Sequence, residues 1–561
     1  MPVKVTVDIE KLERRRQALL AQRSREERTW KEIDRYISPA HDKERETDPN
    51  IWDFTGPDGS RRLTASVCMS AVSPFFRWAK LAHPAGRDDH EVRETVEKIE
   101  DEAFDGFEDS DFYTEMPIFV QALIDKGSAF FVTEPVYDGD EYVGLDCTAI
   151  APEEAVFTAD RKWNVKEFWR DLSWTPSQVV DFCESRNVAP PKDILERYGN
   201  GDDTAIEIVF CIFERPDILR AIRRDPDYNP LAPVVPERRP WGSVYYRKDT
   251  LEALAPEGGY YERPVVYGIF EPKARSKWGV GLGHIALPTV KYVNALLELV
   301  RGAGEKQIDP PWMTDERNIT SAEIDYSPGA INFVRDPERM KPMISGGRVD
   351  VSEQMVADTR AQIRQLYHVD DLQLKDSPAM TATEAQIRYE LMNRVLGSFL
   401  ARFQTSVLGP VMRSHLGNLY RAGRLPPIPE KMRRGIFGIQ YQGPLARSQR
   451  TDEVAAIERF AAQVAGLAQY FPEALAVIDV EKALRNMAQR LGIPAECMRS
   501  PEEVRKKVAE MQAAQAQMQR ANSARKEAAA MKDMAAAQRM LPAAPIAFPG
   551  SPALAPSGVP A

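Results

Sequence analysis

Histidine and cysteine are scarce in this 561-residue chain, and the few that occur are scattered. Its five cysteines form no CxxC pair, and its six histidines form no HExxH motif. Zinc sites and disulfide frameworks need such clusters, so we expect neither a bound metal nor structural disulfides. Dispersed, unpaired cysteines are typical of reduced thiols in a cytosolic compartment.

Long apolar runs are also missing. No stretch approaches the ~18 consecutive apolar residues that a membrane-spanning helix needs. The opening MPVKVTVDIEKLERRR has acidic residues and no apolar segment ahead of its basic run, so a signal peptide is not expected. We therefore expect no membrane partner.

The motifs of common enzyme classes are absent as well. No GxxxxGK[ST] phosphate loop and no GxSxG nucleophile elbow occurs. The series Gly281-x-Gly283-x-x-Ala286 formally fits a dinucleotide fingerprint, but such a loop should follow an apolar strand. Here the basic, polar stretch 273–277 precedes it, which favours a flexible joint into the next helix.

Two acidic clusters could in principle hold metal ions for nuclease chemistry. They are Asp101-Glu102 and the pair Asp109 and Asp111, and no partnered histidine or lysine marks either as a site. A solvated helix face is the simpler interpretation. We therefore expect a protein that is not an enzyme and that has no cofactor.

The formal net charge is −10, so basic residues do not dominate. A protein that grips DNA tightly usually presents a basic surface to the phosphates. An acidic surface instead repels phosphate, which suits a wall along which DNA slides.

The first half of the sequence mixes helical and strand patterns. A long polar helix is predicted from Ile9 to Tyr36, then a turn at 56–59, a second helical pattern, and a proline- and arginine-rich loop from Arg215 to Trp241. Short runs rich in β-branched and aromatic residues predict strands. These runs are 129–132, 154–157, 206–213, 243–247 and 264–270.

Helices dominate the second half, which predicts a mostly helical α+β fold. One helix contains Pro288 in its first turn and stops before Asp309. A compact insert follows, with a strand-like run at 331–334, and a second helix starts at Asp350 and reaches Tyr367. The two helices bracket the insert.

A polar loop then leads to the longest helix, which starts at Thr381 and could continue to Arg421. Gly409 and Pro410 should bend it, because proline removes a backbone hydrogen bond. After it comes a third helical region that Pro472 and Pro494 divide. Its last helix contains a series of methionines, for which packing between neighbouring helices is the favoured explanation, with an adaptable binding surface as the alternative.

Several short segments, taken in order, carry a family resemblance. They are 30–39 (WKEIDRYISP), 53–55 (DFT), 73–78 (SPFFRW), 281–288 (GLGHIALP), 309–311 (DPP), 380–388 (MTATEAQIR) and 423–426 (GRLP). Their order and spacing resemble the portal, or head-to-tail connector, family of short-tailed bacteriophages. The resemblance covers roughly residues 26–505.

The resemblance implies a subunit with an α/β wing, a two-helix stem, a small α/β clip and a helical crown. The implied divisions are a wing at 1–283, stem helix 1 at 284–308, the clip at 309–349, stem helix 2 at 350–368, a channel loop at 369–380, a wing spine helix at 381–445, the crown at 446–540 and a disordered tail at 541–561.

The resemblance also implies the function. Such subunits form a ring, usually of twelve, at one capsid vertex of the virion, and they assemble in the bacterial host cytoplasm. The ring is the conduit for packaging and ejection of double-stranded DNA and binds the terminase motor, the tail adaptor, and the capsid and scaffold proteins. The implied channel-loop residues are Asp370, Asp371, Gln373, Lys375 and Asp376.

Two other interpretations stay open from the sequence. One is a different virion structural protein, such as a tail adaptor or a scaffold, although scaffolds lack a strand-rich first half. The other is an enzyme with unfamiliar site geometry, for which no supporting group of residues is found.

Overall fold

A computed structural model gives the architecture of the chain in two separate units, residues 1–492 and 493–561. It describes residues 6–38, 51–83, 89–138, 141–224, 234–308, 312–313, 336, 338, 341–342, 349–372, 396–429, 432, 438–441, 444–467, 480–491, 493 and 497–538.

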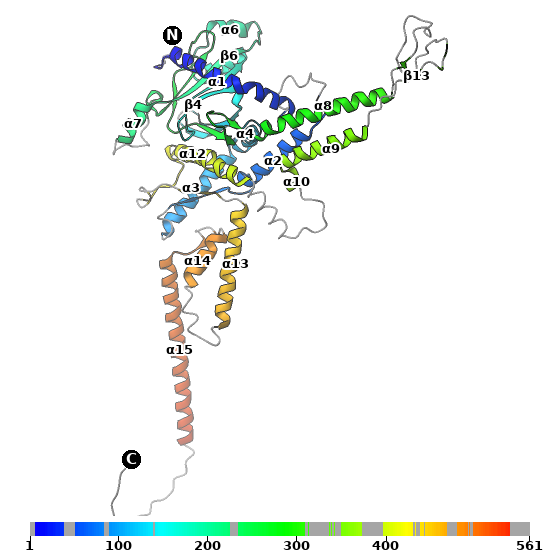
Figure 1. Ribbon diagram of the computed structural model, residues 1–561. Helices are drawn as coiled ribbons and strands as arrows, with labels where there is room; N and C mark the ends of the chain where they lie inside the picture. The colour runs from blue at the N-terminus through cyan, green and yellow to red at the C-terminus, as the bar shows by residue number, and fades with distance from the viewer. Residues whose placement is uncertain are drawn as a thin grey trace, which may run out of the picture. The chain divides into compact units, whose positions relative to one another are not determined.

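The described part is a mostly helical α+β fold, as the sequence predicts (Figure 1). The helices are α1 Ile9–Tyr36, α2 Thr55–Ala71, α3 His90–Glu108, α4 Phe112–Lys126, α5 Pro176–Ser185, α6 Lys192–Gly199, α7 Pro216–Arg224, α8 Leu282–Ile308, α9 Val349–Leu366, α10 Val369–Leu372, α12 Gly409–Arg421, α13 Pro444–Leu467, α14 Val480–Leu491 and α15 Pro501–Gln538.

The strands pair only antiparallel in the described residues. Two larger sheets have the orders β3–β2–β9 and β4–β5–β6–β7–β8, and three two-stranded pairs join β1 to β14, β10 to β11 and β12 to β13. The strands are β1 Ala79–Ala82, β2 Ser128–Asp138, β3 Glu141–Ile150, β4 Ala155–Ala159, β5 Val165–Trp174, β6 Ile206–Glu214, β7 Trp241–Arg247, β8 Gly258–Tyr260, β9 Val265–Ile269, β10 Glu271–Pro272, β11 Gly279–Val280, β12 Trp312–Met313, β13 Lys341–Pro342 and β14 Gly438–Tyr441.

Aromatic side chains join these layers into one core. Phe130 of β2 lies 4.9 Å from Phe157 of β4, and Phe157 lies 5.0 Å from Trp278, measured between ring centroids. On the other face of β2, Phe131 meets Phe119 of α4 edge to face at 5.6 Å. All five rings are buried, so both larger sheets and α4 are held against one another by aromatic packing.

The strand predictions are confirmed where the structure describes them: the five runs lie in β2, β4, β6, β7 and β9. The predicted strand at 331–334 lies outside the described residues. The predicted loop from Arg215 to Trp241 is wrong in part, because α7 occupies its start. A proline at the first helical position and two arginines in the last turn favour this helix.

The turn predicted at 56–59 is wrong, because these four residues lie within the first turn and a half of α2. Pro57 is tolerated there since backbone N–H groups in a first helical turn have no intrahelical partner. Gly56 and Gly59 face neighbouring elements too closely for larger residues. Packing, and not turn formation, accounts for these glycines.

The long helix after residue 381 is described only from residue 396. It reaches Arg421, as predicted, and Gly423 follows with a φ of 71°. A π-helical turn, Gln404–Leu408, immediately precedes Gly409 and Pro410, where the bend is expected. Phe399 and Phe403 on this helix are buried.

The second unit contains α15. Its start is capped reciprocally, since the Glu503 backbone N–H donates to the Ser500 hydroxyl and the Ser500 N–H donates to the Glu503 carboxylate, both at 3.3 Å. The methionines 511, 518, 531 and 534 are 66–72% exposed. The structure of this unit by itself does not test the predicted packing between neighbouring helices, which stays a prediction.

A buried ion cluster attaches α1 to the five-stranded sheet. The guanidinium of Arg16 is 1% exposed and pairs with Glu13 at 2.7 Å and with Asp171 of β5. Arg23 also pairs with Asp171, at 3.0 Å, and the Tyr246 hydroxyl of β7 donates to Glu13 at 2.7 Å. Arg16 supplies compensating charge to both carboxylates, and Asp171 has Arg23 as a second cationic partner.

Replacing Arg16 with methionine should destabilise the protein by roughly 3–5 kcal/mol, because Glu13 would keep its buried charge without a cationic partner and Asp171 would keep only Arg23. Arg14→Met is the matched control, since the Arg14–Glu10 pair is exposed and should contribute less than about 0.5 kcal/mol. Thermal unfolding of both variants measures the difference. Equal melting temperatures would show that the Arg16 cluster does not hold α1 in place.

Candidate functional site

The helix pair α8 and α9 is the candidate site, because it brackets the predicted insert and leads to the predicted channel loop. The two helices lie side by side and leave the sheet-bearing body together, and β12 and β13 pair beyond their far end (Figure 1). Val290 and Val293 of α8 and Val356 and Ile363 of α9 are buried. Helix α8 begins at Leu282, two residues before the predicted stem helix, so Pro288 lies inside it and not in its first turn.

Asp53 and Asn294 clamp the base of this pair. The Asn294 amide oxygen accepts hydrogen bonds from the backbone N–H groups of Trp52 and Asp53, at 2.8 and 3.0 Å. The Asp53 carboxylate, which is 1% exposed, accepts from the Thr55 N–H at the start of α2 and from the Arg360 guanidinium of α9, at 2.9 and 2.7 Å. One buried carboxylate thus ties α2 to α9, and the adjoining backbone is tied to α8.

Two glycines let α2 approach the pair closely. A Cβ atom on Gly56 would lie 3.1 Å from the Val290 side chain, and one on Gly59 would lie 2.9 Å from Tyr367. Tyr367 is fully buried at the end of α9, and His368 follows with a φ of 54°, in the left-handed region that non-glycine residues seldom adopt. The chain therefore leaves α9 through a fixed, sharp change of direction.

The glycine series 279, 281 and 283 packs against the end of α4 and does not form a cofactor loop. Cβ atoms added to these glycines would lie 2.2–2.4 Å from backbone oxygens of residues 124, 125 and 127. Only the two-residue pair β10–β11 precedes α8, where a dinucleotide fold would have a central strand. The glycines thus serve close backbone packing, which a freely flexible joint would lack.

A buried carboxylate lies beside this joint. Asp125 is fully buried and accepts hydrogen bonds from the Ser38 and Ser60 hydroxyls, at 2.6 and 2.7 Å. Burial raises its pKa to about 6, although both hydroxyls and Lys126 favour the charged form. The neighbouring Lys126, 3% exposed, is paired with Asp34 and Glu153, each at 2.8 Å.

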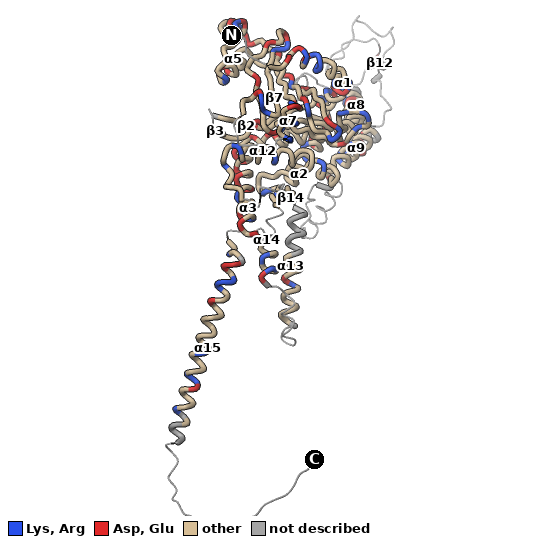
Figure 2. Tube along the Cα trace, turned by 90° about the vertical axis from the view of Figure 1, so that its left-hand side faces the viewer, with Lys and Arg blue, Asp and Glu red and all other residues tan. Residues whose placement is uncertain are grey.

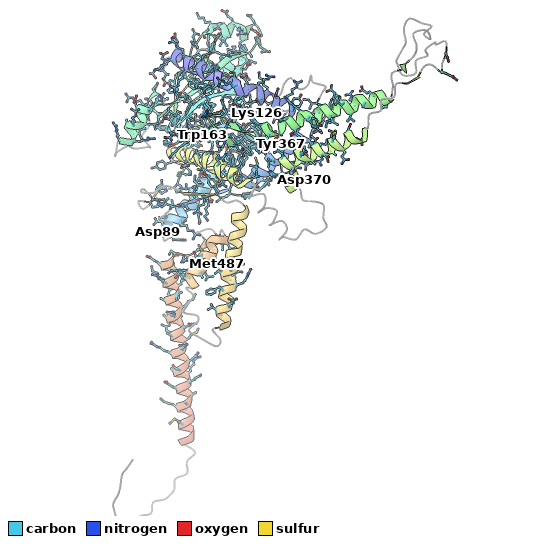
Figure 3. The ribbon with its side chains drawn as sticks, viewed as in Figure 1. Asp89, Lys126, Trp163, Tyr367, Asp370 and Met487 are labelled. Atoms are coloured by element: carbon cyan, nitrogen blue, oxygen red, sulfur yellow. The ribbon has the colours of Figure 1, made fainter. Side chains whose placement is uncertain are left out.

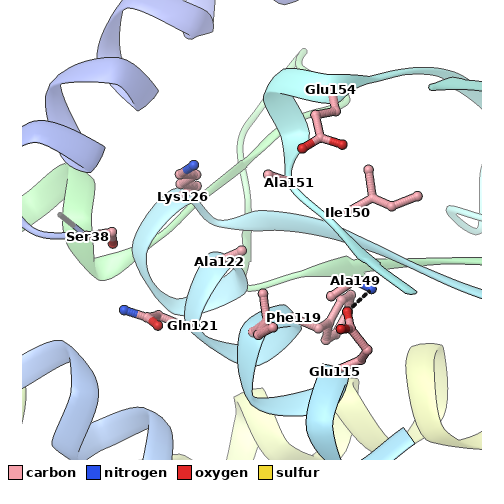
Figure 4. A pocket seen from close by; sticks show the side chains of 11 residues that line it. Ser38, Glu115, Phe119, Gln121, Ala122, Lys126, Ala149, Ile150, Ala151 and Glu154 are labelled. Carbon is pink, nitrogen blue, oxygen red and sulfur yellow. Dashed lines mark hydrogen bonds between the residues drawn. The ribbon is translucent and has the colours of Figure 1, made fainter. Parts of the chain in front are cut away.

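Lys126 also lines a cavity of about 190 Å³ between α4 and β3 (Figure 4). Its polar lining groups are engaged elsewhere: Glu115 accepts from the Ala149 N–H at 2.8 Å, and Glu154 pairs with Arg170 at 3.0 Å. We therefore assign no chemistry to the cavity.

The five predicted channel-loop residues are described only in part. Asp370 is exposed and lies with Asp371 in α10, directly after the turn at His368 (Figure 3). Gln373, Lys375 and Asp376 lie outside the described residues. The structure therefore places Asp370 and Asp371 in a short helix at the base of the helix pair, and the channel loop stays a prediction.

Asp53, Asn294, Arg360 and Asp125 were not found from the sequence. They are single polar residues in segments far apart, and none has a local spacing that marks a motif. The only signal in the sequence is indirect, since Asp53 lies in one of the segments that carry the family resemblance.

No group of three metal-ligating side chains lies together in the described residues. Within that same part of the chain, no helix is both long and apolar enough to cross a membrane.

Comparison with known families decides among the interpretations of this architecture. The family of bacteriophage head to tail connecting proteins matches residues 9–498. The chain belongs to this connector family. The match includes the sheet-bearing body and both helices of the pair, as well as α13 and α14.

Two relatives of this connector chain are curated as portal proteins. It is 23% identical over 491 residues to the probable portal protein of Bordetella phage BPP-1, which covers 83% of this chain and 84% of that protein. It is also 23% identical over 489 residues to the portal protein of Salmonella phage epsilon15, with the same coverage. The similarity thus extends over most of each chain.

The buried Asp125 should make the connector's stability depend on pH. Because its pKa is raised above that of an unfolded aspartate, the folded state favours the protonated form. The stabilisation is therefore complete below about pH 4 and is lost as the pH rises through about 6, by up to about 3 kcal/mol.

Asp125→Asn should remove this dependence, because asparagine has no proton to lose and keeps an oxygen for Ser38 and Ser60. Its melting temperature relative to the wild type should therefore rise between pH 5 and pH 8. Asp58→Asn, at an exposed position on α2, is the control. A constant difference between Asp125→Asn and wild type over this range would contradict the assignment.

Proposed function

We propose that this chain is the portal subunit of a short-tailed phage, a ring-forming protein through which double-stranded DNA is packaged and ejected. The observation that carries the proposal is the match to the connector family over residues 9–498. It is supported by the helix pair α8 and α9, which leaves the body of the fold on either side of the predicted insert. The ring is usually of twelve copies in such proteins, and it would occupy one capsid vertex of the virion.

The subdomains follow from this proposal. The body with the two larger sheets is the wing, α8 and α9 are the stem, and the segment between them is the clip. Residues 369–380 are the channel loop, the helix that ends at Arg421 is the wing spine, and α13 to α15 belong to the crown. The clip would bind the terminase motor and later the tail adaptor, and the wing would meet capsid and scaffold proteins.

The charge distribution supports a sliding function over a gripping one. Lys and Arg alternate with Asp and Glu over the described residues and do not gather into one basic face (Figure 2). With a net charge of −10, a ring of such subunits would hold DNA weakly. The force for translocation would come from the separate motor ATPase, and the portal itself would do no chemistry.

The direct test of this function is DNA packaging. Capsids assembled in infected cells without this chain should contain no nuclease-protected genome, and supplying the wild-type chain should restore packaging. Filled capsids that form without it would contradict the proposed function.

A channel-loop variant tests the proposed site. Lys375 is the only cation among the five proposed loop residues, so Lys375→Glu would surround passing DNA with acidic side chains in every subunit. We expect rings of normal size that package poorly or leak packaged genomes, measured as nuclease-protected DNA per particle.

Lys162→Glu is the control, since it makes the same charge change at an exposed position in the turn between β4 and β5. This variant should package normally. Particles that package and retain DNA normally after the loop is shortened to a few glycines would disprove the channel-loop assignment.

A further inference from the structure

Helix α8 has two apolar faces, and only one of them is buried. The buried face includes Val290 and Val293, which pack toward α2 and α9. The second face, called here the outer stripe, is exposed and also apolar. It consists of Ile285, Pro288, Tyr292, Ala295, Leu299 and Ala303.

The spacing of the outer stripe fits a partner helix. Its members follow one another at three or four residues, so at 3.6 residues per turn they form one line on the side of α8 opposite Val290. The stripe extends over roughly 27 Å at 1.5 Å per residue. Ile285, Tyr292 and Leu299 are 51%, 48% and 70% exposed, which is unusual for large apolar side chains repeated along one helix.

Two charged residues flank the stripe on one side of the helix, Lys291 and the exposed Glu298. Lys291 pairs with Glu32 of α1 at 2.8 Å. Arg301 lies on the opposite side of α8, where it pairs with Glu305 at 3.1 Å and its guanidinium lies 4.2 Å from the centre of the Trp52 ring. The stripe is therefore apolar with one exposed acidic residue at its edge, which suits another apolar surface and not the phosphates of DNA.

We propose that the outer stripe of α8 is a contact between neighbouring copies of this chain. The inference rests on the proposed ring and assigns a surface to it. Subunits related by rotation about a ring axis meet through two different surfaces, so the stripe must contact another part of the next copy. Since α2 and α9 pack on the opposite side of α8, their outward side faces the other neighbour. Phe54, which directly precedes α2, and Met355 of α9 are 64% and 41% exposed, and the proposal assigns these apolar side chains to that surface.

If α8 makes the contact between copies, α9 can face water. Gln354, Asp358, Gln362 and Gln365 are exposed on one face of α9 and are uncharged or acidic, whereas the exposed Arg364 lies on another face. Such side chains are suited to an aqueous channel wall, whereas the outer stripe is not. The stem would therefore close the ring with α8 and expose polar residues of α9 to water.

Leu299→Glu in the full-length chain tests the proposal. At 70% exposure the substitution should leave circular dichroism and the melting temperature of the chain nearly unchanged. Assembly should weaken, because each contact would desolvate a carboxylate, and the concentration for half-assembly should rise roughly tenfold or more. Leu299→Ser should give a smaller shift in the same direction. Mass photometry over a concentration series measures the effect.

Leu195→Glu is the matched control, an exposed leucine on α6 that lies outside the stripe, and it should assemble like the wild type. If Leu299→Glu forms rings at the same protein concentrations as the wild type, the outer-stripe assignment is overturned. That result would leave the portal function intact and would point to another virion protein as the partner of the stripe. A wild-type chain that forms no ring would instead contradict the proposed function itself.

Discussion

Backbone packing between the end of α4 and the start of α8 determines where the helix pair leaves the body. Glycines 279, 281 and 283 allow backbone contacts that any Cβ atom would block. Gly127, at the end of α4, packs against residues 280 and 281 and has a φ of 75°. A side chain at any of these positions would push α8 away from α4. The clamp at Asp53, the close approach of α2 and the position of Tyr367 all depend on α8 being in this place.

Buried polar groups then specify the orientation of the pair. Apolar packing alone would let α8 and α9 slide against α2, because it has little directional preference. The hydrogen bonds of Asp53 and Asn294 have fixed geometry, and breaking them would leave buried donors unpaired at about 1–3 kcal/mol each. The same logic applies to Asp125, whose two serine partners come from the end of α1 and from α2. These buried hydrogen bonds at the base of the helix pair thus hold α8 and α9 in one orientation.

Much of this fold follows from local sequence patterns. The ends of α1, the end of α8 before Asp309 and the extent of α9 were predicted within a residue or two, because apolar periodicity and proline punctuation decide them. The predicted turn at Gly56 failed because long-range packing on Val290 and Tyr367, and not local propensity, explains that glycine-rich segment. The clamp could not be predicted either, since Asp53, Asn294 and Arg360 are brought together only by the tertiary fold. The channel-loop residues rest on a family resemblance, and the structure describes only Asp370 and Asp371 among them.

The central proposal is that copies of this chain close into a ring with an open axis. Electron microscopy of the purified full-length protein tests it most directly, because an axial hole distinguishes a portal from a scaffold, a tail adaptor or an enzyme of compact shape. The account predicts closed rings of uniform size, usually with twelve-fold symmetry, and a central opening wide enough for duplex DNA. A stable monomer at micromolar concentration, or particles without an axial opening, would contradict it.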